Sequence, residues 1–256
     1  MTTKQRIGLV LVAAGLAGGL SARAQAPAAP TNNPTQWTST AAAGLTLTRG
    51  NSDTFLATVS AASGKKWEAN EIILGADMTY GKTKDQTTGQ STRNADSYRA
   101  FAQYNRLFTE RLYGYGRVEG LYDSIAGVKY RFTISPGAGY YLIKEKGTDL
   151  AVELGPGYVF QKLGNDRSSF ATIRVGEKFH HELSDRSRIW QLAEWLPKAD
   201  DFSNYILNAE FGIEADLTAN KKATLRTYVQ DTYNSVPALG RKKNDVKLVA
   251  AIAYKF

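Results

Sequence analysis

Carboxylates at alternate positions are the first feature of this sequence that could do chemistry. Glu210, Glu214 and Asp216 are spaced by even numbers, and successive side chains of a strand face opposite sides, so all three would line one face. Along an extended strand Glu210 and Glu214 would stand roughly 13 Å apart, too far for a catalytic pair of carboxylates. The spacing instead suits ion pairing, or the charged wall of a polar passage for ions.

Groups for covalent or metal chemistry are scarce. The 256 residues include no Cys and two His, which excludes a disulfide framework, a cysteine-rich zinc site and a cysteine nucleophile. His180 and His181 are neighbours, so on a strand only one of them could act from a given face. No G-x-S-x-G motif is present, and no serine is placed beside either histidine. We expect no catalytic residue, no metal and no cofactor, and keep a lipid hydrolase that uses His180 as the catalytic alternative.

A period of two in hydrophobicity predicts the elements that position these groups. From Trp37 to Phe256, runs of roughly 10–16 residues alternate apolar and polar side chains. The last run is typical, with Val246 and Leu248 on one face and Lys247 on the other. The pattern predicts twelve strands, near residues 36–48, 53–63, 67–81, 94–108, 111–123, 128–143, 148–161, 169–182, 187–197, 203–218, 222–234 and 243–256.

Three features favour a membrane barrel over a soluble barrel or sandwich. The expected strands exceed the usual 5–6 residues of soluble sheets, and many aromatic residues lie near strand ends, as in interfacial girdles. The chain ends on Tyr254 and Phe256 within an alternating strand, which resembles the membrane insertion signal of bacterial outer-membrane barrels. We therefore predict an all-β fold, a closed antiparallel up-and-down transmembrane β-barrel of twelve strands.

The first residues predict export. Lys4 and Arg6 precede an apolar run from Ile7 to Leu20, and small residues lead to Ala24, the pattern of a secretory signal. A retained anchor is the weaker alternative, since about 14 residues fall short of the ~20 that span a bilayer. We predict a cleaved signal at 1–24, a flexible periplasmic linker at 25–35 and one barrel domain at 36–256. Both termini would be periplasmic and the loops extracellular, in the bacterial outer membrane.

The net charge of the chain limits the classes of binding partner that we expect. The chain carries 32 basic and 24 acidic residues, and removal of Lys4, Arg6 and Arg23 with the signal leaves 29 against 24. This small, scattered excess leads us to expect no nucleic-acid partner. We expect instead outer-membrane lipid and lipopolysaccharide, the barrel assembly machinery and periplasmic chaperones during biogenesis, and small ions or solutes.

The polar face of the strands is expected to line the lumen. Charges inside a barrel must be paired or hydrated, so one interpretation is a salt-bridge network that holds the wall. The other is a constriction of opposed basic and acidic ladders that selects ions, and the two are compatible. Twelve strands enclose a barrel roughly 24 Å across, much of it filled by side chains. The candidate lining residues are Arg99, Arg117, Glu119, Lys129, Arg131, Glu153, Arg174, Glu210, Glu214, Arg226 and Lys247.

Two kinds of loop feature remain. Arg49, Gly50, Asn51 and Asp53 form a candidate turn motif, and because glycine and asparagine tolerate positive φ, a hairpin turn is favoured over a ligand site. The loops expected at 82–93 and 237–243 carry cations that could bind the phosphates of lipopolysaccharide. These cations are Lys82, Lys84, Arg93, Arg241, Lys242 and Lys243.

Several stretches resemble one family. They are Gly44–Thr54, Gly127–Arg131 running on to Pro136–Tyr141, Leu154–Tyr158, and Pro237 with Lys242–Asp245 and Ala253–Phe256. They span nearly the whole chain after the signal, and Thr-Arg-Gly-Asn-Ser-Asp-Thr is the most distinctive run, whereas the 82–93 loop matches no pattern. The chain thus resembles the salt-induced outer-membrane proteins, an uncharacterised family classed as a domain of unknown function. The resemblance implies a Gram-negative outer-membrane β-barrel and no known activity.

These observations lead to one functional expectation and two alternatives. We expect a non-catalytic, porin-like narrow channel or an envelope-integrity protein with a mixed-charge lumen. The alternatives are a barrel-embedded lipid hydrolase, and a surface-loop binding protein for lipopolysaccharide or another envelope partner.

Overall fold

The computed structural model describes residues 36–48, 52–85 and 87–256. The expected signal and linker, together with Arg49, Gly50 and Asn51 of the turn motif, lie outside the described residues. The twelve strands are β1 (Thr38–Thr48), β2 (Ser52–Trp67), β3 (Asn70–Asp85), β4 (Ser91–Leu107), β5 (Leu112–Asp123), β6 (Val128–Glu145), β7 (Thr148–Leu163), β8 (Asp166–Ser184), β9 (Ser187–Lys198), β10 (Asp201–Asp216), β11 (Ala223–Asn234) and β12 (Asn244–Lys255).

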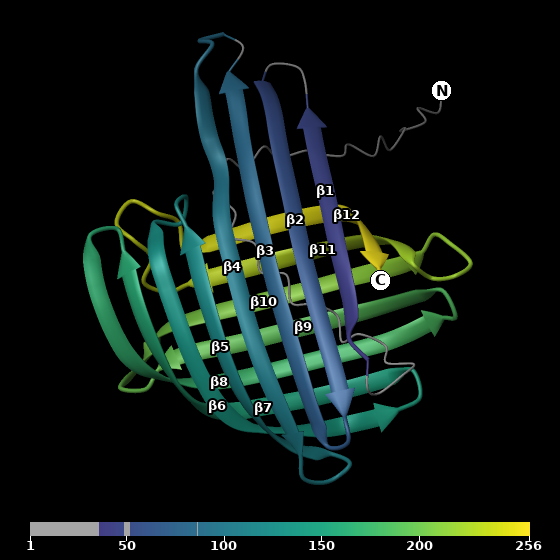
Figure 1. The fold of residues 1–256 in the computed structure, drawn as a ribbon. Coiled ribbons are helices and arrows are strands. Elements are labelled where there is room, and N and C mark those ends of the chain that lie inside the picture. Colours follow the sequence, from purple (N-terminus) through teal and green to yellow (C-terminus); the bar gives the residue numbers. More distant parts are fainter. Residues whose placement is uncertain (1–35, 49–51, 86) are drawn as a thin grey trace, which may run out of the picture.

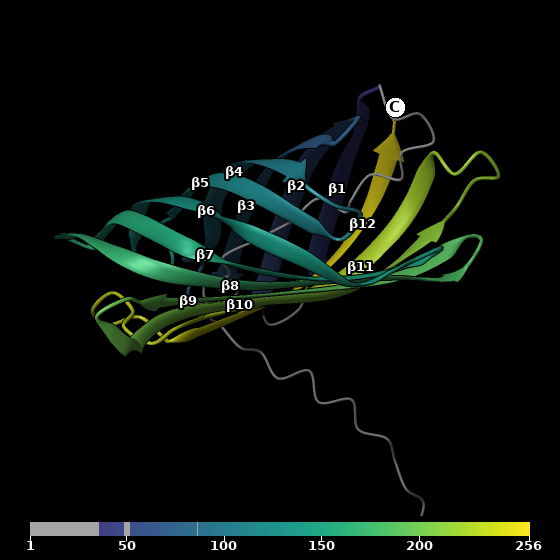
Figure 2. The same ribbon diagram turned by 90° about the horizontal axis from the view of Figure 1, so that it is seen from below.

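The strands form one closed antiparallel barrel, which confirms the predicted fold class. Each strand pairs with the next along the chain, and β12 returns to β1. Figure 1 shows β1–β4 running steeply across β8–β12 of the opposite wall, and their upper ends projecting beyond the rim. Figure 2, a view from below, shows that the barrel is flattened. No helix within the described ranges is long and apolar enough to cross a membrane.

The two faces of the wall have the polarity expected in a membrane. Leu248 is 67% exposed and Phe211 is 53% exposed on the outside, whereas Lys247 and Glu153 are each only 1% exposed inside. A soluble barrel would bury its apolar face and hydrate its polar one. The observed inversion therefore distinguishes a membrane barrel from the soluble alternative.

Inward glycines accommodate large neighbours. A Cβ added to Gly137 would lie 2.6 Å from the Tyr115 ring, and one added to Gly139 would lie 2.2 Å from the Tyr113 ring. At Gly155 the added Cβ would meet the backbone oxygen of Pro136 at 2.1 Å. These glycines therefore let tyrosine rings and a neighbouring strand approach the wall closely, and they leave little open lumen.

The hairpins differ from the prediction in two places. The pattern predicts that the second strand ends near residue 63, but β2 continues to Trp67 and the turn falls at Glu68, whose φ is 47°. Ser63, Gly64 and Lys65 resemble a turn in composition, yet they pair fully with β3. The 82–93 loop is also shorter than expected, because Lys82 pairs with Arg93 and the ladder extends to Lys84 opposite Ser91.

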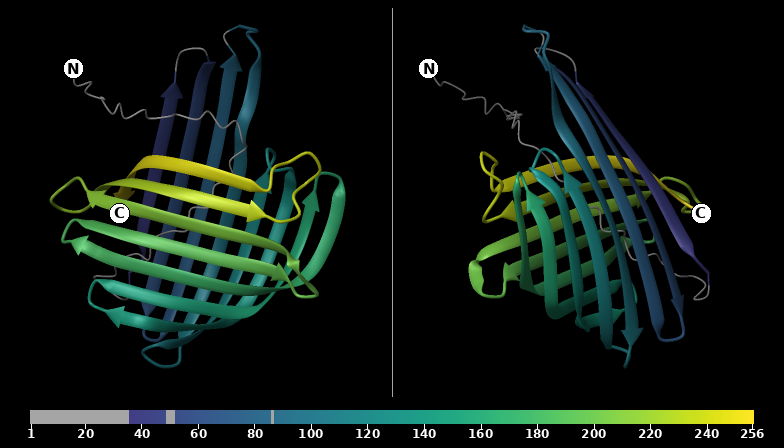
Figure 3. Two further views of the ribbon diagram at one scale, coloured as in Figure 1. Left: turned by 180° about the vertical axis from the view of Figure 1, so that it is seen from behind. Right: turned by 60° about the vertical axis from the view of Figure 1, so that its left-hand side comes forward.

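The seam between β1 and β12 is short. Four residue pairs join these strands, ending at Ala43 opposite Ile252, whereas β1 and β2 share eleven pairs. Beyond that point the strands diverge, as the two views of Figure 3 show. A Cβ added to Gly44 would lie 2.5 Å from the carbonyl oxygen of Ala250, so the crossing of the two strands requires glycine.

Candidate functional site in the lumen

The strands place ten of the eleven candidate lining residues inside the barrel. Each is at most 6% exposed, and they come from β4 to β12. They are Arg99, Arg117, Glu119, Arg131, Glu153, Arg174, Glu210, Glu214, Arg226 and Lys247.

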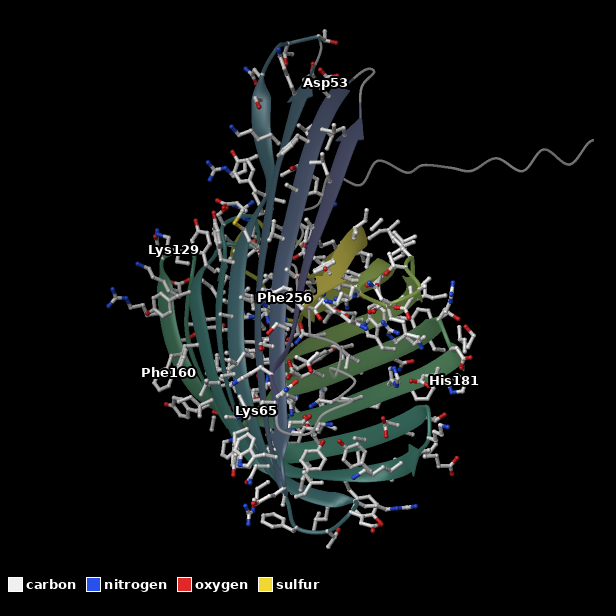
Figure 4. All side chains as sticks on the ribbon, turned by 45° about the vertical axis from the view of Figure 1, so that its right-hand side comes forward. Asp53, Lys65, Lys129, Phe160, His181 and Phe256 are labelled. Carbon is white, nitrogen blue, oxygen red and sulfur yellow. The ribbon has the colours of Figure 1, made fainter. Side chains whose placement is uncertain are left out.

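Lys129 does not line the lumen, and its predicted position is wrong. Its side chain is exposed at the rim, where its Nζ donates a hydrogen bond to Asn165 Oδ1 at 3.3 Å (Figure 4). The register shifts between Val128 and Tyr130, so strict alternation counted back from Arg131 assigns Lys129 to the wrong face.

Arg99 and Arg117 share one carboxylate. Each places its Nη2 2.8 Å from Glu119 Oε2, and Arg99 Nη1 lies 3.7 Å from Asp77 Oδ2. Both guanidinium groups also lie over Phe101, with Cζ 5.1 and 4.2 Å from the ring centroid. Two carboxylates and an aromatic face thus offset two arginines of like charge.

Four side chains of the described strands bond the Glu153 carboxylate in the lumen. Arg174 Nη1 and Lys178 Nζ each lie 2.6 Å from it, and its side chain has no exposed area. The Tyr113 hydroxyl donates to it at 2.9 Å and Gln103 Nε2 at 3.1 Å. Donors from β4, β5 and β8 therefore converge on one residue of β7 and fix the position of its carboxylate.

Trp190 lies against the inner wall of β10. A Cβ added to Gly212 would meet its ring at 2.2 Å, and its Nε1 donates to Glu210 Oε1 at 2.5 Å. Gln230 Nε2 donates to the other oxygen of Glu210 at 2.5 Å. The Arg226 guanidinium lies 4.8 Å from the Trp190 ring centroid, so an aromatic ring and an amide help to hold this charged layer.

Another cluster of charged residues surrounds Glu214, at the end of the barrel that carries the C-terminus. Arg188 Nη2 donates to Glu214 Oε1 and, at 3.2 Å, to Asp216 Oδ1. Arg226 Nε and Lys255 Nζ lie 3.4 and 3.7 Å from the Glu214 oxygens. Three cations therefore share two carboxylates at this end.

Lys247 bridges strands that are not neighbours. Its Nζ, on β12, donates to Thr79 Oγ1 of β3 at 2.6 Å across the two intervening strands β1 and β2. This contact connects β12 to β3 at a point beyond the last residue pair of the short β1–β12 seam.

The lumen is wider toward the end of the barrel at which the C-terminus lies. A vestibule of about 130 Å³ has a mixed lining that includes Phe101, Tyr113 and Arg188. It shares Arg117 and Lys178 with a cavity of about 30 Å³ nearer the middle, which has room for only a few small groups such as water. The passage thus narrows where the charged side chains meet.

The lumen offers little for catalysis. His180 lines the vestibule, whose described lining contains no serine, whereas His181 contacts Thr148 Oγ1 at 2.8 Å. Figure 4 shows His181 at the rim. Within the described ranges no group of three or more His, Asp or Glu side chains could hold a metal ion.

Sequence reasoning missed the aromatic and amide partners of the charges. Tyr113, Tyr115 and Trp190 all point inward and are at most 5% exposed. Tyr113 and Tyr115 have the same parity as Arg117, which could have placed them in the lumen. The identity of their partners depends on contacts between strands that are not neighbours, which alternation does not encode.

Other candidate residues lie at the two ends of the barrel. Asp53 lies at the tip of the projecting strands in Figure 4. Tyr254 and Phe256 face outward and are 50% and 68% exposed, a position suited to their expected role in insertion. Their role remains a prediction.

The fold and the polar lumen within an apolar outer wall define an outer-membrane β-barrel. The chain belongs to the family described as "Protein of unknown function, DUF481", whose model matches residues 41–256. That description does not mention salt induction, so this part of the expectation stays a prediction. No curated protein sequence matches the chain.

Solved structures of bacterial outer-membrane barrels resemble the whole domain. The NanC porin is 11% identical with a TM-score of 0.50, over 86% of this chain and 98% of its own. The translocator domain of the autotransporter NalP from Neisseria meningitidis is 16% identical with a TM-score of 0.43, over 88% and 89%. At such identities the likeness to NanC supports the fold alone.

Proposed function

We propose that this barrel is a narrow, non-catalytic channel for small ions or solutes, with the charged layer of the lumen as its constriction. One observation carries the proposal. The vestibule of about 130 Å³ leads to a cavity of about 30 Å³ lined by opposed charges, among them Arg99, Arg174, Glu194 and Glu210. Charged rings of this kind set selectivity in polar pores.

The size of the constriction limits what passes. A space this small admits a small, partly dehydrated ion, while a larger solute requires the ion pairs to rearrange. Arg174 is the side chain best placed to regulate this, because it bonds both Glu153 and Glu194 at 2.6 and 2.7 Å. We further propose that both termini are periplasmic and that the hairpin loops at the opposite end of the barrel, such as the one between β3 and β4, are extracellular. This is the usual arrangement of an even-stranded barrel.

Single-channel conductance of the refolded full chain in a planar bilayer tests this function. We expect small discrete steps for the natural protein and larger steps for Arg174→Ala, which removes one of the charged side chains that line the constriction. Arg186→Ala is the matched control, since Arg186 is exposed in the turn between β8 and β9. Heat-modifiable gel migration confirms that each variant is a closed barrel.

The opposite result is equally clear. If folded natural protein and folded Arg174→Ala are both electrically silent, the channel proposal is wrong. The ion-pair network would then support the second candidate, an envelope-integrity protein whose lumen is held shut. Should Arg174→Ala fail to fold, Glu194→Gln keeps the side-chain volume and is expected to shift selectivity toward anions.

A further inference from the structure

Two cations come together on the outer face of the projecting strands. Lys82 and Arg93 are register partners on β3 and β4. Lys82 Nζ and Arg93 Cζ each lie 5.6 Å from the centroid of the Tyr80 ring, on the outward face of the strands. Cations above an aromatic residue of a girdle lie at the level of lipid headgroups.

Both cations keep hydrogen-bond donors for a ligand. Arg93 Nη1 bonds Asp96 Oδ2 at 2.6 Å, but the Arg93 side chain is 52% exposed and a guanidinium has five N–H donors. Lys82 is exposed, and in the described part of the chain no carboxylate lies within ion-pair distance of it. The bond to Asp96 fixes the Arg93 guanidinium and leaves its other donors free for an anion.

A groove runs across the outer wall below these cations. It has a volume of about 540 Å³, and its floor includes Ala61, Ala76 and Ala100, which are directly paired across β2, β3 and β4. Large residues form its wall on the side of the cations, and the Tyr98 and Tyr122 rings there are 5.8 Å apart. The groove is therefore an open, mostly apolar depression in a surface that faces the hydrocarbon.

The spacing of groove and cations fits an acylated phosphate. Ala76 and Lys82 are six residues apart on β3, roughly 20 Å along the strand. At a strand tilt of about 45° this is roughly 14 Å in depth, a distance that one acyl chain covers below its headgroup. The positive charges of Lys82 and Arg93 complement a phosphate, and the apolar groove complements an acyl chain.

We propose that the outer face of β2–β5 is a specific binding site for lipopolysaccharide, with a lipid A phosphate on Lys82 and Arg93 and an acyl chain in the groove. The site lies on the outside of the wall, so it is independent of conduction through the lumen. It places lipopolysaccharide in the outer leaflet, in agreement with the proposed extracellular position of the β3–β4 hairpin.

Native mass spectrometry of the full chain in detergent, titrated with lipid A, tests the site. Lys82→Gln with Arg93→Gln is expected to weaken lipid A binding about 30-fold, which is about 2 kcal/mol at 1.4 kcal/mol per factor of ten. The control is Lys162→Gln with Arg167→Gln, because these cations are also register partners, on β7 and β8. The control should retain natural affinity.

A second pair of variants tests the groove without changing charge. Ala76→Leu with Ala100→Leu fills the floor and should weaken binding several-fold, whereas Ala102→Leu, outside the groove lining, should not. Equal weakening by the control variants would overturn the site. Equally tight binding of phosphatidylglycerol would overturn the choice of lipopolysaccharide, and a dimer dispersed by the groove-filling variant would assign the groove to a second copy of the chain.

Discussion

Glu153→Gln removes the negative charge on which Lys178 depends. In the natural protein Lys178 Nζ lies 2.6 Å from Glu153, while Arg174 keeps a second carboxylate, Glu194, at 2.7 Å. Removal of one partner from a buried ion pair costs about 3–5 kcal/mol. The Lys178 side chain is 23% exposed, so water offsets part of that cost. We expect the free energy of unfolding to fall by about 3 kcal/mol.

Urea unfolding of the full chain in lipid vesicles, followed by tryptophan fluorescence, measures this loss. Glu145→Gln is the matched control, because Glu145 is exposed at the end of β6 and should change stability by less than about 0.5 kcal/mol. A double variant, Glu153→Gln with Lys178→Met, removes both charges and should recover most of the loss.

The reasoning fails if Glu153→Gln and Glu145→Gln lose the same small amount. The lumen would then be hydrated well enough to screen its charges, and the network would not hold the wall. Failure of the double variant to recover stability would show instead that the amide and tyrosine hydrogen bonds to Glu153 matter more than its charge.

Two further predictions concern single side chains. Gly212→Ala places a methyl group where the Trp190 ring lies, so we expect a loss of about 1–3 kcal/mol in urea unfolding. Gly116→Ala, with nothing within 4 Å of the added carbon, should lose clearly less, and equal losses would contradict the packing argument. Phe256→Ala should slow insertion by reconstituted assembly machinery while the folded barrel keeps its stability. Leu248→Ala, at a similarly exposed outward position, should insert at the natural rate, and equal slowing would remove the special role of the last residue.

Much of the wall could be predicted because a strand has only two faces. Once β10 and β12 are recognised by their alternation, the inward direction of Glu210, Glu214 and Lys247 follows from parity. Parity fails at Lys129, where one irregular residue changes the assignment of its neighbours. It also says nothing about the turn at Glu68, because composition alone does not fix where a ladder ends.

The network itself could not be predicted to the same degree. That Glu153 faces inward follows from its neighbours on β7, but its bonds to Gln103 and Tyr113 depend on which residues of β4 and β5 reach the same depth. That depth is set by the tilt of the strands and the stagger around the whole barrel. Small errors at each hairpin accumulate around the ring, so contacts across the lumen are beyond reach of a pattern read one strand at a time.

The short seam has a consequence for the order of folding. Every neighbouring pair except β1–β12 is a hairpin, local in sequence, whereas Ala43 and Ile252 are 209 residues apart (252 minus 43). Closing a loop of that length costs about 5 kcal/mol in chain entropy. That cost is opposed by the four ladder pairs of the seam, the backbone hydrogen bonds between Ser39 and Phe256, and the Lys247–Thr79 hydrogen bond. We therefore expect the chain to pass through a curved open sheet whose terminal strands meet last. The free edges of that sheet are where a helper protein or a second nascent barrel can engage it.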